Sequence, residues 1–260
     1  MTPPLSYLEF HMLFVLPPIL LLGWLARRRS GTWWGRRPLS GLGIILILAV
    51  VYTTPWDNVL IDVGVWWYGD GAVVATIWHA PVEEYLFFVL QPILTAFFLF
   101  LFPTGADQSL RIPASHRFVG AVGGLGIGVV GWLLLGSSST FYLGAILLWA
   151  GPILAIQWAF GLTYLWRVRR RATLAILVPS VYLWIADRIA IGMGIWVISE
   201  EYTTGYALFG LPIEEATFFL VTNVFVVQGI VLYMWLLDRV GDIPALAGVL
   251  ERAPVTFDVR

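Results

Sequence analysis

The motif Pro-x-Glu-Glu-x-x-Phe-Phe occurs twice in this chain, at residues 81–88 and 212–219, each time at the start of an apolar run. Proline and acids both suit the first turn of a helix, so helix initiation at a water interface would explain one copy. A second copy with the same spacing favours proton chemistry instead. Because neighbouring helical residues point about 100° apart, we expect one acid of each pair to face inward and the other to support it. The pairs are Glu83 with Glu84, and Glu214 with Glu215.

Two aspartates lie within other apolar segments, where ionisable residues are costly and are candidates for function. Asp57 precedes Asn58, and Asp187 precedes Arg188, for which a buried ion pair is the plain structural interpretation. A carboxyl group in an apolar pocket has a raised pKa because burial disfavours its charged form. It then stays protonated at neutral pH and serves as an acid, while an ionised partner accepts a proton. Six such carboxyl groups predict acid–base work on an apolar molecule.

Aromatic side chains accompany these acids in both halves of the chain. Their π-faces can stabilise a carbocation, although packing or contact with lipid is the alternative role. The candidates for contact with a substrate, together with Asn58, are Phe87, Phe88, Phe218, Phe219, Trp66, Trp67 and Trp196.

Composition excludes several classes of function. The 260 residues are 59% hydrophobic and 12% charged, against about a quarter charged in a soluble domain. The absence of cysteine rules out thiolate metal sites and cysteine nucleophiles. The near-neutral net charge argues against nucleic-acid binding. The three histidines show no metal-ligand spacing, and neither a metal nor a cofactor is expected; they are His11, His79 and His116.

Seven segments have the length and apolar character of a membrane-spanning helix, which needs about 20 residues. The sequence therefore predicts an all-α polytopic membrane protein. The expected spans are 7–26, 40–61, 83–102, 118–136, 141–165, 173–195 and 213–237.

Arginine fixes the expected orientation, because basic residues collect in cytoplasmic loops. Clusters at 27–29, 36–37, 111–117 and 167–171 all fall on one side of a seven-span arrangement. We expect a multi-pass protein of the cell membrane with its N-terminus outside and its C-terminus in the cytoplasm.

The chain also contains an internal repeat. Residues 57–66 resemble 187–196, and residues 16–24 resemble 150–158. An additional span between the copies makes the two three-helix repeats parallel, related by an axis along the membrane normal. Segments 64–78 and 194–210 look like hairpins on the outer side, folded around Gly69–Gly71 and around Glu201–Gly205. The expected domains are a first repeat (1–105), a linking helix (106–138), a second repeat (139–238) and a cytoplasmic tail (239–260).

Taken together, the two motifs resemble a known family. The continuations FFVLQPILT (87–95) and FFLVTNVFVVQG (218–229), with PWDN at 55–58 and GVWWYGDG at 64–71, are similar to the membrane-integral lycopene β-cyclases. The resemblance covers nearly the whole chain, with both halves in one polypeptide as in the fungal fused form. The second copy departs from it where PWDN becomes IADR.

The resemblance implies a non-redox cyclisation of the ψ-ends of lycopene, through a carbocation, to γ-carotene and then β-carotene. Carried over, Glu83, Glu84, Glu214 and Glu215 are the acid–base candidates, and Asp57, Asp187 and Arg188 are second candidates. Lycopene, γ-carotene and membrane lipid are the expected partners, and association with other carotenoid enzymes is compatible with this role.

Rival functions are weaker. A proton-coupled transporter of an apolar or amphipathic small molecule is the alternative from another class, since repeats and buried carboxylates suit transporters. A retinal protein is excluded because the chain has no lysine, and the Asp-rich motifs of a prenyltransferase are missing. The pattern GIGVVG (126–131) fits the Gly-x-Gly-x-x-Gly pattern of dinucleotide-binding sites. It lies within a span and no strand precedes it, so a dinucleotide site is rejected. Gly120, Gly124 and Gly128 are better interpreted as a helix-packing face.

Overall fold

The computed structural model describes residues 2–29, 31, 33–102 and 111–239, and within them seven helices are long and apolar enough to cross a membrane. This confirms the predicted all-α polytopic fold. The first crossing is continuous through α1 (Tyr7–Phe10), a π-helix (His11–Val15) and α2 (Leu16–Arg28). The other helices are α3 (Arg36–Val63), α4 (Val82–Leu99), α5 (Ala114–Leu134), α6 (Phe141–Arg167, after a 3-10 turn at Ser138–Thr140), α7 (Arg169–Met193) and α8 (Ile213–Arg239).

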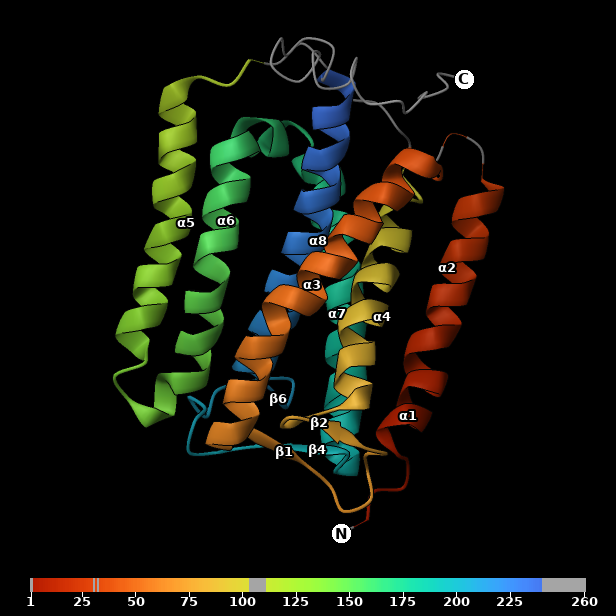
Figure 1. The fold of residues 1–260 in the computed structure, drawn as a ribbon, viewed down its shortest axis with the longest axis vertical. Coiled ribbons are helices and arrows are strands. Elements are labelled where there is room, and N and C mark those ends of the chain that lie inside the picture. The colour runs from red at the N-terminus through yellow and green to blue at the C-terminus, as the bar shows by residue number, and fades with distance from the viewer. Residues whose placement is uncertain (1, 30, 32, 103–110, 240–260) are drawn as a thin grey trace.

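Figure 1 shows α4, α7 and α8 at the centre of the bundle, with α2 at one edge and α5 with α6 at the other. The short strands gather at the end of the bundle near the N-terminus, which we call the strand end. The turns that carry the arginine clusters lie at the opposite end. The predicted tail at 239–260 lies outside the described residues except for Arg239.

The strands lead each repeat from its second helix to its third. They are β1 (Trp66–Tyr68), β2 (Thr76–Ile77) and β3 (Ala80–Pro81) in the first repeat, and β4 (Trp196–Ile198), β5 (Ala207–Leu208) and β6 (Leu211–Pro212) in the second. Gly64 and Gly194 end α3 and α7 in the left-handed conformation, with φ of 85° and 73°. Glycine adopts this conformation without steric cost, so the chain turns directly into β1 and β4.

The strand pairing differs from the expected hairpins around Gly69–Gly71 and Glu201–Gly205. Strand β1 pairs antiparallel with β4 of the other repeat, and only the tight hairpins β2–β3 and β5–β6 stay within one repeat. The sequence pattern predicts that a segment is a strand, but it does not indicate which strand, here one about 130 residues away, will pair with it. Because Trp67 and Val197 occupy matching positions and pair with each other, a local two-fold axis passes between the repeats at this point.

Helix α5 packs against α6 through the predicted glycine face. A Cβ atom at Gly124 would lie 2.1 Å from the backbone nitrogen of Ala155, and one at Gly120 would lie 2.4 Å from the carbonyl oxygen of Trp158. Only glycine permits such close backbone approach. These glycines therefore join two helices, as predicted.

Candidate functional site

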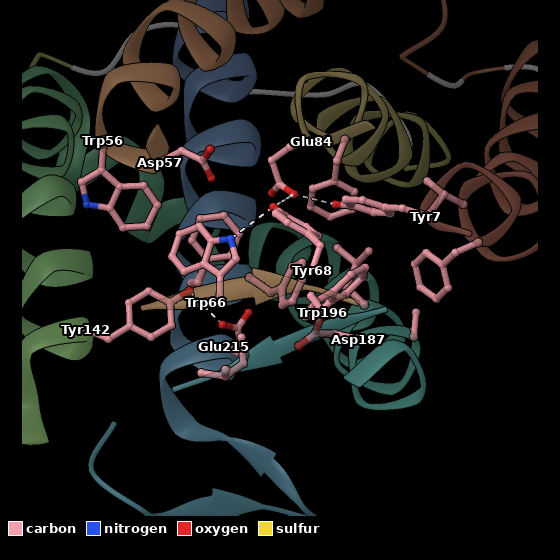
Figure 2. Close-up of a pocket in the computed structure, with 18 residues that line it drawn as sticks. Tyr7, Trp56, Asp57, Trp66, Tyr68, Glu84, Tyr142, Asp187, Trp196 and Glu215 are labelled. Carbon is pink, nitrogen blue, oxygen red and sulfur yellow. Dashed lines mark hydrogen bonds between the residues drawn. The ribbon is translucent and has the colours of Figure 1, made fainter. Parts of the chain in front are cut away.

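A buried chamber lies at the strand end between the two repeats, with a cavity volume of about 50 Å³ (Figure 2). Its roof comes from β1 and β4. Side chains alternate along a strand, so Trp66 and Tyr68 of β1, with Trp196 of β4, face the chamber. Trp67 points to the other side and is 49% exposed. The structure thus does not bring this candidate to the chamber.

The two Pro-x-Glu-Glu motifs begin α4 and α8, and each sends its second glutamate into the chamber. Figure 2 shows Glu84 and Glu215 entering from opposite sides. The first glutamates are also buried but support the loops instead. Glu83 Oε1 accepts the N–H of Val74 at 2.8 Å. Glu214 Oε1 accepts both the N–H and the hydroxyl of Thr204, each at 2.8 Å.

Tyrosines hold the two inward glutamates. The hydroxyl of Tyr7 donates to Glu84 Oε2 at 2.9 Å, and that of Tyr68 donates to the same oxygen at 2.8 Å. Burial, followed by the negative charge of Glu84, raises the pKa of Tyr68 well above its ordinary value, so this hydroxyl remains a donor. Across the chamber, Tyr142 donates to Glu215 Oε1 at 2.8 Å.

Tyr7 and Tyr142 are functional candidates that the sequence analysis missed. Each lies in the first turn of the first helix of its repeat. Their N–H groups donate to main-chain carbonyl oxygens in matching loops, at Ala72 and Tyr202. From Tyr7 to Pro18 is one residue more than from Tyr142 to Pro152. A π-helix commonly takes up one such extra residue, and one is present at His11–Val15. This insertion hides the match from a fixed-offset comparison.

Asp57 and Asp187, from the matching helices α3 and α7, also line the chamber and are 2% and 3% exposed. Trp196 donates its indole N–H to Asp187 Oδ1 at 2.9 Å. In both aspartates Oδ2 is buried without a hydrogen-bond partner. The anticipated ion pair between Asp187 and Arg188 is absent from the described residues, because Arg188 points away from the chamber and is exposed.

Asn58 also lies outside the chamber, where it fixes the β2–β3 hairpin. Its side-chain oxygen accepts the N–H groups of His79 and Ala80 at 2.9 and 3.1 Å. Its nitrogen donates to the carbonyl oxygen of Thr54 and to the hydroxyl of Tyr85. Asn58 therefore positions the loop before the first motif.

Aromatic rings form much of the remaining chamber wall. Phe87, Phe218 and Phe219 line it, whereas Phe88 faces the neighbouring apolar space. Trp56, which the sequence analysis did not select, stacks on Phe218 with ring centroids 5.8 Å apart and planes 5° apart. Among the described residues, no group of three or more His, Cys, Asp or Glu is placed to hold a metal ion. The chamber thus combines buried carboxyl groups with π-faces.

Known proteins with related sequences have one activity in common. A family model described as lycopene cyclase matches residues 6–102 and again residues 139–235. A lycopene beta-cyclase of Halobacterium salinarum is 48% identical over 235 residues, covering 90% of this chain and 98% of that protein. Bifunctional lycopene cyclase/phytoene synthases are also similar. That of Arthroderma gypseum is 36% identical over 87% of this chain and 41% of its own length, and that of Blakeslea trispora is 33% identical over 84% and 37%.

No solved structure shows a significant match. The double match to the family model confirms the internal repeat, and its two segments contain both glutamate motifs and both tyrosines. The chain belongs to the lycopene cyclase family.

Proposed function

We propose that this protein is a lycopene β-cyclase, which closes the ψ-ends of lycopene into β-ionone rings without net oxidation or reduction. The observation that carries the proposal is the convergence of Glu84 and Glu215 in one buried, aromatic-lined chamber. The activity printed for the relatives from Halobacterium salinarum supports the same conclusion.

The reaction needs one proton donor and one proton acceptor. The donor protonates the terminal double bond of a ψ-end and creates a tertiary cation. A neighbouring double bond attacks this cation and closes a six-membered ring. A carboxylate then removes one proton, so the product is an isomer of the substrate. Two rounds convert lycopene to γ-carotene and then to β-carotene.

The hydrogen bonds support different roles for the two glutamates. Hydroxyl donors stabilise the ionised form of a carboxyl group, and Glu84 receives two of them whereas Glu215 receives one. Glu84 is therefore the base and Glu215 the acid. Asp57 and Asp187, each with one buried oxygen free of hydrogen bonds, return the proton between turnovers.

The aromatic wall stabilises the cation. Trp56 and Phe218, which stack on each other, line the chamber together with Trp66 from the roof. A cation over an aromatic face gains about 0.5–2 kcal/mol, with the higher value where water is excluded. Exclusion of water by β1 and β4 also protects the cation from hydration.

The membrane orientation follows from the charge asymmetry. Among the described residues, the arginine clusters at 27–29, 36–37, 111–117 and 167–171 lie opposite the strand end. The positive-inside rule therefore favours a strand end and N-terminus that face outward and a C-terminus in the cytoplasm. The two glutamate motifs then lie near the outer surface. Lycopene and γ-carotene reach the enzyme through membrane lipid, where it can associate with other carotenoid enzymes.

Expression in a lycopene-accumulating bacterium tests the proposal. The parent protein should convert red lycopene to bicyclic β-carotene. Glu84→Gln and Glu215→Gln should each lower the rate by about 10²–10⁴-fold, the usual contribution of general acid–base catalysis. Glu200→Gln, at an exposed position in the β4–β5 loop, is the matched control and should keep the parent rate. Unchanged lycopene with a membrane-inserted parent protein would refute the function.

A further inference from the structure

An apolar slot adjoins the chamber between α3, α4, α6 and α8. Its cavity volume of about 170 Å³ is more than three times that of the chamber. Phe87 and Phe218 line both spaces and form their common wall. The chamber therefore suits the end of a long molecule, and the slot suits the chain behind that end.

The lining of the slot is mostly apolar. Three of its polar side chains donate to main-chain carbonyl oxygens: Tyr52 to Trp149, Gln157 to Phe225 and Thr222 to Phe218. A further lining residue, Gln91, donates to the side-chain oxygen of Asn223, and Gln157 Oε1 is a buried polar atom of the slot that has no hydrogen-bond partner among the described residues. Donors satisfied in this way have no need of a polar ligand. An extended apolar chain is the ligand that matches such a lining.

The slot opens to lipid between α3 and α6. Leu48 lines it and is 56% exposed. The adjoining outer face of α6 carries a further exposed apolar residue, Ile156. Along α8 the lining runs from Phe218 to Val226, a length of about 12 Å at 1.5 Å per residue. The remainder of a longer chain would extend into the bilayer.

Among the described residues, the matching position on the other side of the two-fold axis is packed with side chains. Tyr182 donates to the carbonyl oxygen of Phe14 as Tyr52 does to that of Trp149. Beside this bond, however, Ile19 and Leu94 are buried in a hydrophobic cluster. They correspond to Ile153 and Phe225 of the slot in the repeat alignment. The two repeats thus share the chamber but not the slot.

We propose that the slot holds the polyene of lycopene, which enters sideways from lipid between α3 and α6. This inference rests on the proposed cyclase function. Because the part of the chain that the structure describes has this slot beside one repeat and packed side chains at the matching place, the chamber receives one ψ-end at a time. The second ring forms only after the monocyclic product has left and re-entered in the reversed direction.

Binding can be tested without turnover, because the chain contains no cysteine. Ala49→Cys places a thiol in the slot, and Val51→Cys places one on the lipid-facing side of the same helix. In proteoliposomes with lycopene at about four times its Kd, labelling of Ala49→Cys by an apolar maleimide should slow about fivefold. Labelling of Val51→Cys should not change. Equal labelling rates of Ala49→Cys with and without lycopene, or equal slowing of both variants, would overturn the slot assignment even if the parent protein makes β-carotene.

Turnover provides the second test. Ala49→Trp should lower the initial rate on lycopene about tenfold, because the end is then poorly positioned, while Val51→Trp keeps the parent rate. A short ψ-ended isoprenoid that does not fill the slot should be cyclised equally by Ala49→Trp and the parent. Equal slowing of Ala49→Trp on lycopene and on the short isoprenoid would contradict the proposal. If Ala49→Trp does not fold, the rates of Ala49→Leu on the two substrates are compared with those of the parent in the same way. With excess lycopene, monocyclic product should precede bicyclic product, and bicyclic product from the first turnover would refute re-entry.

Discussion

The two sides of the chamber are built from corresponding parts of the repeats, yet they bond their glutamates differently. Tyr7 and Tyr142 each donate to the inward glutamate of their own repeat. In the first repeat Tyr68 adds a second bond, whereas Ile198 occupies the matching position in β4. One polar side chain in place of an apolar one therefore gives two chemically different carboxyl groups on a duplicated scaffold.

The difference between Tyr68 and Ile198 also changes the hydrogen bonds of the two aspartates. The indole N–H of Trp66 donates to the hydroxyl of Tyr68 at 3.2 Å, while that of the matching Trp196 donates to Asp187. Asp57 thus receives no bond from Trp66. The proposed division of acid and base work between the repeats is based on this difference in hydrogen bonding.

The largest expected difference between Glu84 and Glu215 is in their protonation state at neutral pH. If Glu215 is the acid, it carries a proton at neutral pH and contributes a carboxylic acid C=O band to the infrared spectrum. The difference spectrum between parent and Glu215→Gln should show complete loss of one such band. Glu84→Gln should remove a carboxylate band instead. The opposite pattern would exchange the two roles.

Removal of the tyrosine hydroxyl that donates to the inward glutamate should lower the rate more in the second repeat than in the first. Among the described residues, Tyr142 is the one tyrosine that donates to Glu215. Tyr142→Phe therefore leaves the buried Oε1 of Glu215 without its donor, which costs about 1–3 kcal/mol, or about tenfold in rate. Tyr7→Phe leaves Tyr68 on Glu84 and should cost about threefold. Initial rates with lycopene in proteoliposomes measure both, and equal losses would argue against the asymmetry.

Tyr68 and Ile198 occupy matching positions but differ in type, and a change at either should make the hydrogen bonding of Glu84 and Glu215 more alike. Tyr68→Ile leaves Glu84 with one donor, and Ile198→Tyr offers Glu215 a second. We expect Tyr68→Ile to lower the rate about threefold, as loss of one shared hydrogen bond would. The more conservative Tyr68→Phe should act alike if the hydroxyl, not the shape, matters. Recovery of the parent rate by Tyr68→Phe would assign Tyr68 a packing role only.

The smallest effect on chemistry is expected at the outer glutamates, where stability should change instead. Glu214→Ala leaves two groups of Thr204 without their acceptor, and Glu83→Ala leaves one group, the N–H of Val74. A buried unsatisfied group costs about 1–3 kcal/mol, so Glu214→Ala should lower the thermal midpoint more. A calorimetric scan in detergent checks this order. A larger loss in Glu83→Ala would show that the loops depend on other contacts.

The sequence predicted the seven spans, the duplication and the glycine face because these depend on local composition and period. It also identified both glutamate pairs, and their 100° separation correctly anticipated that one of each would face inward. The pairing of β1 with β4 was beyond it, since strand patterning carries no information on distant partners. The ion pair of Asp187 with Arg188 was wrong because adjacent helical residues point to different faces.

The missed residues share a physical reason. Tyr7, Tyr142 and Trp56 are single aromatics in a chain rich in aromatics, and only the fold makes them neighbours of acids. The one-residue insertion at the π-helix further concealed the match of Tyr7 to Tyr142. The slot was invisible because its lining consists of ordinary apolar helix residues from four helices.

A double-mutant comparison tests the shared chamber most directly. Initial rates of ring formation would be measured for Glu84→Gln, Glu215→Gln and the double variant in proteoliposomes with lycopene. If both glutamates act on one ψ-end, each single variant should be almost as inactive as the double, because residues acting as a unit are non-additive. Separate active sites in the two repeats would instead leave each single variant with about half the parent rate and only the double variant inactive. That second result would contradict a single proton-handling chamber.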